Sequence, residues 1–77
     1  MQLEDLSIKE ILVLKSLEKE PKVATRIAEE LNIPPTTIYN ILYRLQAEDL
    51  VRKENNRKWI ITEQGKKILK KVIEVIG

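Results

Sequence analysis

The sequence predicts a mainly α-helical fold with one small β-hairpin, in the order helix, strand, helix, helix, strand, strand, helix. Apolar residues recur at i, i+3, i+4 and i+7 in several segments, which is the period of an amphipathic helix. Residues 50–62 instead join β-favouring residues across an asparagine pair, which is typical of a hairpin. With 77 residues in the chain, we expect residues 1–77 to form one domain with no room for a second.

The composition excludes several kinds of site. The chain has no cysteine and no histidine, which rules out disulfides and the usual ligand sets of zinc, haem and iron–sulfur clusters. It also lacks a glycine-rich phosphate loop, so we expect neither an enzyme nor a bound cofactor or metal. A domain of this size is marginally stable alone, and oligomerisation is the stabilising device that remains.

The sequence shows no sign of a membrane or export signal. No apolar run approaches the ~18 residues that a transmembrane helix requires, and the acidic start lacks the apolar centre of a signal peptide. We therefore expect a cytoplasmic protein without a membrane partner. Abundant Lys, Glu and Ile, with few thermolabile residues, favour a heat-loving, archaeal-like source.

The net charge of +2 is unevenly distributed. Residues 1–34 carry five basic and seven acidic side chains, whereas residues 35–77 carry nine basic and five acidic ones. Residues 52–71 hold eight basic side chains against Glu54 and Glu63. A local basic region on a nearly neutral domain indicates a polyanionic partner. The alternative is that the lysines of residues 66–71 are simply a solvated helix face.

The first helix is predicted by its N-terminal signals. Ser7 fits the N-cap position and Glu10, three residues later, completes a capping box. Leu6 and Ile11 fit the flanking hydrophobic staple. Pro21 ends the helix, because the residue before a proline disfavours the α region.

Two helices joined by a short turn follow, at about residues 24–31 and 35–48. Val23 is expected to be a short extended segment before them. Asn32 can adopt the left-handed conformation that ends the first of the two, and Pro35 suits the first position of the second. This spacing predicts a helix-turn-helix at about residues 24–48, although a plain αα-hairpin shares the short turn.

The hairpin and the last helix complete the chain. The Asn55-Asn56 pair predicts the hairpin turn, because asparagine tolerates positive φ. Trp59 is interpreted as core at the root of the hairpin, with a stacking platform as the less favoured alternative. Thr62 fits the N-cap of a final helix over about residues 63–76.

This order of elements resembles the winged-helix family. The stretch VATRIAEELNIPPTTIYNILYRLQAEDLV is similar to its helix-turn-helix, and WIITEQGKKIL is similar to the end of its wing and the start of its last helix. The resemblance covers about residues 8–70 and is closest to the small PadR, MarR and TrmB-like regulators, without a choice among them. It implies a sequence-specific regulator that binds double-stranded DNA. Asp49 stands where such proteins usually carry glycine, and aspartate can adopt the required left-handed conformation at some cost.

The helix at residues 35–48 has two different faces. Ile38, Ile41, Leu42 and Leu45 form the predicted core stripe. The opposite face has no acidic residue until Glu48 and carries groups that suit the major groove of DNA. The candidate DNA-binding residues on this helix are Thr36, Thr37, Tyr39, Asn40, Tyr43 and Arg44.

Plainer interpretations remain open for three of them. In these interpretations Tyr39 would pack at the core boundary and the Thr36 hydroxyl would only serve the helix start. Arg44 would only pair with Glu48 one turn later. Basic residues at the predicted wing, residues 52–58, are expected to contact the DNA backbone or the minor groove, which positions a protein without specifying sequence. These candidates are Arg52, Lys53, Arg57 and Lys58, with Arg26 on the supporting helix.

The first and last helices carry more apolar surface than so small a core needs. We expect a two-fold homodimer that places two recognition helices about one DNA turn apart. Its expected interface residues are Leu3, Leu14, Val72, Val75 and Ile76. The competing interpretations are a winged helix that binds only protein and an architectural protein that binds any DNA sequence. No small-molecule effector is expected, because the predicted elements leave little space for its pocket.

Overall fold

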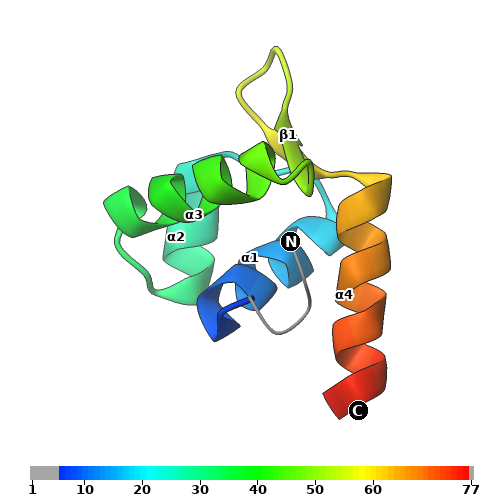
Figure 1. Cartoon of the computed structure of the whole chain (residues 1–77). Coiled ribbons are helices and arrows are strands. Elements are labelled where there is room, and N and C mark those ends of the chain that lie inside the picture. Colours follow the sequence, from blue (N-terminus) through cyan, green and yellow to red (C-terminus); the bar gives the residue numbers. More distant parts are fainter. Residues whose placement is uncertain (1–5, 77) are drawn as a thin grey trace.

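The structure is a computed structural model and describes residues 6–76, with side chains through residue 75. It contains four helices and two strands among these residues: α1 (Ile8–Lys19), α2 (Ala24–Leu31), α3 (Pro35–Ala47), β1 (Val51–Lys53), β2 (Trp59–Ile61) and α4 (Glu63–Ile76). Figure 1 shows the hairpin of β1 and β2 standing out from the helices, with α3 beside its base and α4 on the other side. The predicted fold class, mainly helical with one small hairpin, is confirmed.

The predicted ends of α1 are confirmed by its hydrogen bonds and backbone angles. The N–H of Glu10 donates to Ser7 Oγ at 3.2 Å, and the N–H of Ser7 donates to Glu10 Oε1 at 3.0 Å, so the capping box forms. At the other end, Glu20 before Pro21 is extended, with φ −167° and ψ 158°. Proline geometry therefore ends this helix, as expected.

The turn between α2 and α3 is set by local chemistry. Asn32 adopts the left-handed conformation, with φ 56° and ψ 45°, and its N–H reaches the carbonyl oxygens at the end of α2. Pro35 is the first residue of α3, where its missing N–H leaves no helical bond unmade. Asp49 also lies in the left-handed region, with φ 61°, so the turn after α3 forms without glycine.

The hairpin forms where predicted, with one difference in its turn. Val23 is extended as expected, with φ −76° and ψ 155°, and is also the N-cap of α2, while its neighbour Lys22 makes an isolated β-bridge with Trp59. The positive φ of the turn belongs to Arg57, at 67°, and not to either asparagine. The hydrogen bonds from Arg57 N to Glu54 O and from Glu54 N to Lys58 O explain this, because a three-residue hairpin loop needs its left-handed residue last.

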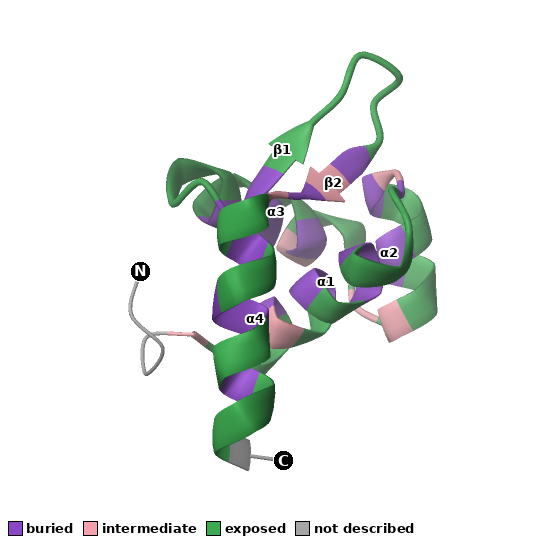
Figure 2. Ribbon diagram, turned by 90° about the vertical axis from the view of Figure 1, so that its right-hand side faces the viewer, coloured by how far each residue is buried: buried purple, intermediate pink, exposed green. Residues whose placement is uncertain are grey.

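The core lies between the inner faces of the helices and the root of the hairpin (Figure 2). Thr62 caps α4 as predicted, since its Oγ1 accepts a hydrogen bond from Gly65 N at 3.0 Å. A Cβ at Gly65 would collide with the carbonyl oxygen of Leu50, so this helix start requires glycine. Leu14 and Val72 are also buried, which contradicts their assignment to spare surface for a dimer.

Candidate nucleic-acid interface

The α3 helix presents one buried face and one exposed face, as the sequence predicted. Its buried residues are Ile38, Ile41, Leu42 and Leu45. Thr36 and Asn40 are exposed, Tyr43 is 53% exposed, and no acidic side chain lies between Pro35 and Ala47. Thr37 is partly buried. The exposed face therefore offers hydroxyl and amide groups without a negative charge to repel phosphate.

Arg44 has a partner that the sequence did not reveal. Its Nη1 lies 3.8 Å from Oε1 of Glu10 in α1, and 62% of the Arg44 side chain remains exposed. The Glu10 side chain is 2% exposed, and its Oε2 is buried without a hydrogen-bond partner. This contact joins α1 to one edge of the exposed face of α3. The Arg44–Glu10 contact joins residues 34 positions apart in the sequence, and helical periodicity cannot predict such a contact.

The two tyrosines of α3 lie on the edge that faces the hairpin. Their ring centroids are 6.2 Å apart at 25°. The rings of Tyr43 and Trp59 form a T-shaped pair, with centroids 5.9 Å apart and planes at 73°. Trp59 is 1% exposed, so it belongs to the core at the root of the hairpin. This was the favoured interpretation, and the alternative of a stacking platform is excluded. Tyr39 is at the boundary of burial, 37% exposed.

A groove of about 460 Å³ runs between the start of α2, α3 and the hairpin. Its basic side chains are Lys53 and Arg57, and Tyr39 and Trp59 form part of its wall. The Lys53 Nζ lies 5.7 Å from the centre of a Trp59 ring, over its face. We call this hollow the wing groove. It brings two of the predicted wing cations to the side of α3 that carries the tyrosines.

The other two hairpin cations lie elsewhere. Arg52 alternates with Lys53 along β1, so its side chain leaves the opposite face of the hairpin. Its Nε lies 3.4 Å from Glu54 Oε2, which partly neutralises it. Lys58 lines a second hollow together with Arg26, the candidate residue of the supporting helix. The four cations that the sequence grouped together are thus divided among three surroundings.

Lys22 ties the root of the hairpin to α1 and α2. Its backbone N–H and C=O bond to Trp59 at 3.1 and 2.7 Å. Its side chain is 8% exposed, and Nζ donates to Ser16 O, Ser16 Oγ and Glu30 Oε1 at 2.9, 2.9 and 2.6 Å. The hydrogen bond from Lys22, with a smaller contribution from Ser16, lowers the pKa of the Glu30 carboxyl below its ordinary value.

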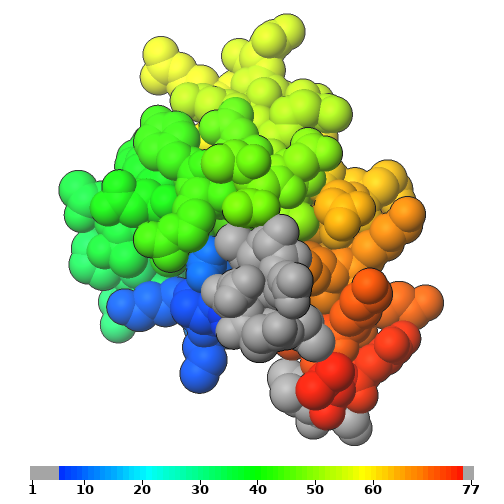
Figure 3. All heavy atoms as spheres, in the orientation of Figure 1, coloured from blue at the N-terminus to red at the C-terminus, as the bar shows by residue number. Residues whose placement is uncertain are grey.

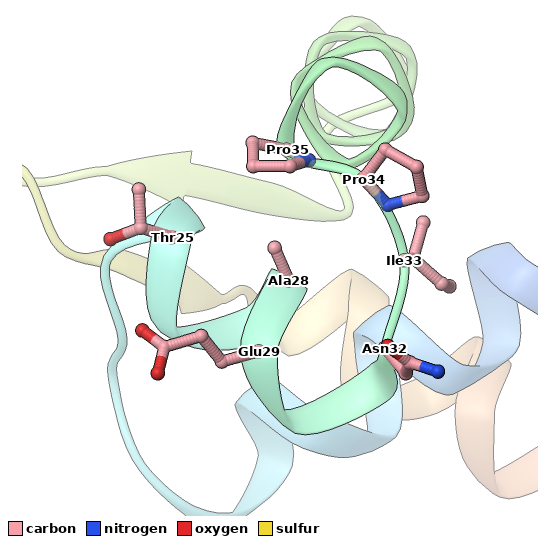
Figure 4. A pocket seen from close by; sticks show the side chains of 7 residues that line it. All are labelled: Thr25, Ala28, Glu29, Asn32, Ile33, Pro34 and Pro35. Carbon is pink, nitrogen blue, oxygen red and sulfur yellow. The ribbon is translucent and has the colours of Figure 1, made fainter.

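A further hollow of about 510 Å³ lies at the turn between α2 and α3 (Figure 4). Ile33, Pro34 and Pro35 form one side of it, and the only charged side chain that lines it is that of Glu29. A carboxylate with no lysine or arginine beside it disfavours an anion. A phosphate therefore fits the wing groove better than it fits this hollow.

The described surface of α3 continues into the hairpin without a break in the space-filling view (Figure 3). In residues 6–76 no group of three histidine, cysteine or acidic side chains is placed to hold a metal ion. None of the described helices has the length and apolar character needed to cross a membrane.

Solved structures share this arrangement of helices and hairpin. MarR from E. coli superposes with a TM-score of 0.92 at 19% identity, over 97% of this chain and 58% of that one. A MarR family protein of Mycobacterium tuberculosis, solved in complex with DNA, gives 0.84 at 19% identity, over 94% and 57%. The regulator BldR of Sulfolobus solfataricus gives 0.85 at 26% identity, over 94% and 56%. The chain thus spans little more than half the length of each.

No curated protein sequence matches the chain. One family profile does match, from residue 2 to residue 75, and its description is "Sugar-specific transcriptional regulator TrmB". The match includes every helix and strand given above except the last residue of α4. The fold and this match over nearly the whole sequence agree with the winged-helix resemblance. The chain belongs to the TrmB family of transcriptional regulators.

Proposed function

We propose that this chain binds double-stranded DNA in a sequence-specific manner as part of a transcriptional regulator. The α3 helix enters the major groove, and the hairpin, or wing, lies on the backbone or in the minor groove. One observation carries the proposal: the exposed face of α3 has no acidic side chain and borders a groove that contains Lys53 and Arg57. That combination suits double-stranded DNA, which presents negative phosphates along its backbone and base edges in its major groove.

The exposed residues of α3 receive distinct roles. Asn40 can bond bidentately to adenine, and Arg44 to guanine or to a phosphate. Thr36 and Thr37 lie in the first turn, where unpaired N–H groups and the helix dipole favour a phosphate. Contact with DNA requires Arg44 to leave Glu10 or to bridge both partners, and its 62% exposure permits either.

The wing supplies contacts that position the protein. Lys53 and Arg57 in the wing groove, and Lys58 with Arg26 in the second hollow, are proposed to meet backbone phosphates. Arg52 contributes less, because Glu54 already lies beside it. Each phosphate neutralised adds about −0.9 to the slope of log affinity against log salt concentration.

The fold neighbour solved with DNA supports this assignment, since a winged helix of the same shape forms part of a DNA complex there. The family description supports regulation of transcription. We propose that the protein acts in the cytoplasm, where bacterial and archaeal DNA is found. We also propose that these residues bind no small-molecule effector themselves, since the hollow at the turn offers mainly apolar side chains and one carboxylate.

A homodimer through the first and last helices remains part of the proposal, with revised residues. Of the expected interface, Leu14 and Val72 belong to the core, Leu3 lies outside the described residues, and the side chain of Ile76 is not described. Val75 is 69% exposed and stays a candidate. The other exposed apolar residues of α1 and α4 are Ile8, Leu12 and Ile73. Sedimentation at tens of micromolar should show a dimer, and a monomer alone would contradict it.

Selection of bound duplexes from a random pool tests the main proposal. We expect a consensus sequence, and a pseudo-palindromic one if the dimer binds. Affinity for the selected duplex should fall steeply with salt. If no duplex binds at about 50 mM salt, DNA binding is wrong and a protein partner becomes the better reading. Binding without a consensus would indicate an architectural protein.

A further inference from the structure

We infer that Tyr43 is a positioning residue, whose ring holds the wing in register with the recognition helix by packing on Trp59. The inference rests on the proposed function and deepens it, because it says how two separate DNA-contacting elements are kept at a fixed spacing. It also changes the role of Tyr43, which the sequence placed among the residues that read DNA.

The contact geometry separates Tyr43 from the polar residues of the same helix. Its ring packs at 73° to Trp59, with centroids 5.9 Å apart, and Trp59 is 1% exposed and therefore part of the core. The Tyr43 ring also stacks with the ring of Tyr39. Among the described residues, the Tyr43 hydroxyl makes no hydrogen bond to another protein group, whereas its ring contacts Tyr39 and Trp59.

The packing of Tyr43 on Trp59 can affect the whole wing, because Trp59 joins the two strands and the bridge at Lys22. Its backbone pairs with Lys53 in β1 on one edge and with Lys22 on the other. Its indole also lies under the Lys53 ammonium, which places that cation over the ring. A shift of Trp59 therefore moves Lys53 directly.

Beyond its buried root, little fixes the orientation of the wing. Each strand has three residues, and a hairpin of this length is marginally stable without packing. Its tip, from Arg52 to Lys58, is exposed. The buried root must therefore set the angle at which Lys53 and Arg57 reach a backbone, and the ring of Tyr43, on the exposed face of α3, packs on that root.

A double-mutant cycle on the full chain with the selected duplex tests the inference. Tyr43→Leu keeps an apolar helix former but loses the ring, Tyr43→Phe keeps the ring but loses the hydroxyl, and Gln46→Ala is an exposed control on α3. We expect Tyr43→Phe to bind with unchanged affinity. Tyr43→Leu should weaken DNA binding and flatten its salt dependence, because the wing loses its contacts with the phosphates of the DNA backbone.

The cycle combines Tyr43→Leu with the pair Lys53→Ala and Arg57→Ala. If Tyr43 acts through the wing, removing the two cations should cost at least about threefold less affinity in the Tyr43→Leu background than in the wild type. Independent effects would overturn the inference, as would a loss in Tyr43→Phe equal to that in Tyr43→Leu. Either result would assign Tyr43 a direct DNA contact.

A second measurement needs no DNA. Trp59 is the single tryptophan of the chain, so its fluorescence reports the wing root. Tyr43→Leu should change this emission and speed amide exchange at Glu54 and Arg57, while exchange in α2 stays as in the wild type and in Gln46→Ala. Unchanged exchange in the wing would overturn the inference. If these changes occur but no duplex binds, the coupling stands and the proposed function fails.

Discussion

The recognition helix α3 and the wing form one candidate interface, but they are held in place in different ways. Four buried aliphatic side chains fix α3, and a proline starts it. The wing has two three-residue strands and an exposed tip, and its position depends on Trp59 and Lys22. The firmly held helix suits the reading of bases, whereas the hairpin suits contacts to the backbone, which position the protein without specifying sequence. Five predictions test this difference.

The largest expected effect is on the anchoring of α3. Leu42→Ala removes a fully buried side chain and should lower the free energy of unfolding by about 2–5 kcal/mol, because it leaves a cavity. Urea denaturation measures it, with Gln46→Ala as the surface control on the same helix. A loss near that of the control would mean that the buried stripe does not anchor α3.

The next effect separates base reading from backbone contact. Asn40→Ala should weaken binding to the selected duplex by about 1–3 kcal/mol and leave binding to unrelated duplexes unchanged, because the amide contacts a base edge. Fluorescence anisotropy with both duplexes measures it. An equal loss on every sequence would assign Asn40 to the backbone and would weaken the contrast with the wing.

Strain at the wing tip gives a smaller effect on stability. Arg57 has φ 67°, a conformation that costs a non-glycine residue about 1–2 kcal/mol. Arg57→Gly should therefore raise the melting temperature while DNA affinity falls. Arg57→Ala is the matched control, since it removes the charge and keeps the strain. A melting temperature no higher for glycine than for alanine would show that the turn stores no strain.

The two faces of the wing should differ in salt dependence. Lys53→Ala removes a cation of the wing groove and should reduce the slope of log affinity against log salt by about 0.9, the value for one phosphate. Arg52→Ala should change the slope less, because Glu54 lies 3.4 Å from that guanidinium. Equal changes would show that both faces contact the backbone.

The smallest effect concerns pH and the root of the wing. The Glu30 pKa is lowered by its hydrogen bond from Lys22, so the carboxylate stabilises the folded chain above its ordinary pKa of 4.5. That stability is lost as pH falls through the lowered value. Thermal unfolding of Glu30→Gln should show a flatter pH dependence below pH 4.5 than the wild type. Parallel profiles would show that this pair does not contribute.

Local patterns predicted most of the fold. The capping box of Ser7, the left-handed Asn32 and Asp49, and the cap at Thr62 each depend on residues within a few positions of one another. The two faces of α3 follow from a period of 3.6 residues, because burial alternates with that period. The sequence therefore determined the elements, their order and the acid-free face that carries the functional proposal.

Contacts between distant residues were decided only by the tertiary structure. The tertiary contacts of this kind are the pairing of Arg44 with Glu10, the packing of Tyr43 on Trp59 and the β-bridge of Lys22 with Trp59, which join segments that no periodicity relates. The burial of Leu14 and Val72 was likewise hidden, because an apolar stripe looks the same whether its own chain or a partner covers it. Sequence thus determined what each element is, and packing in three dimensions decided which side chains meet.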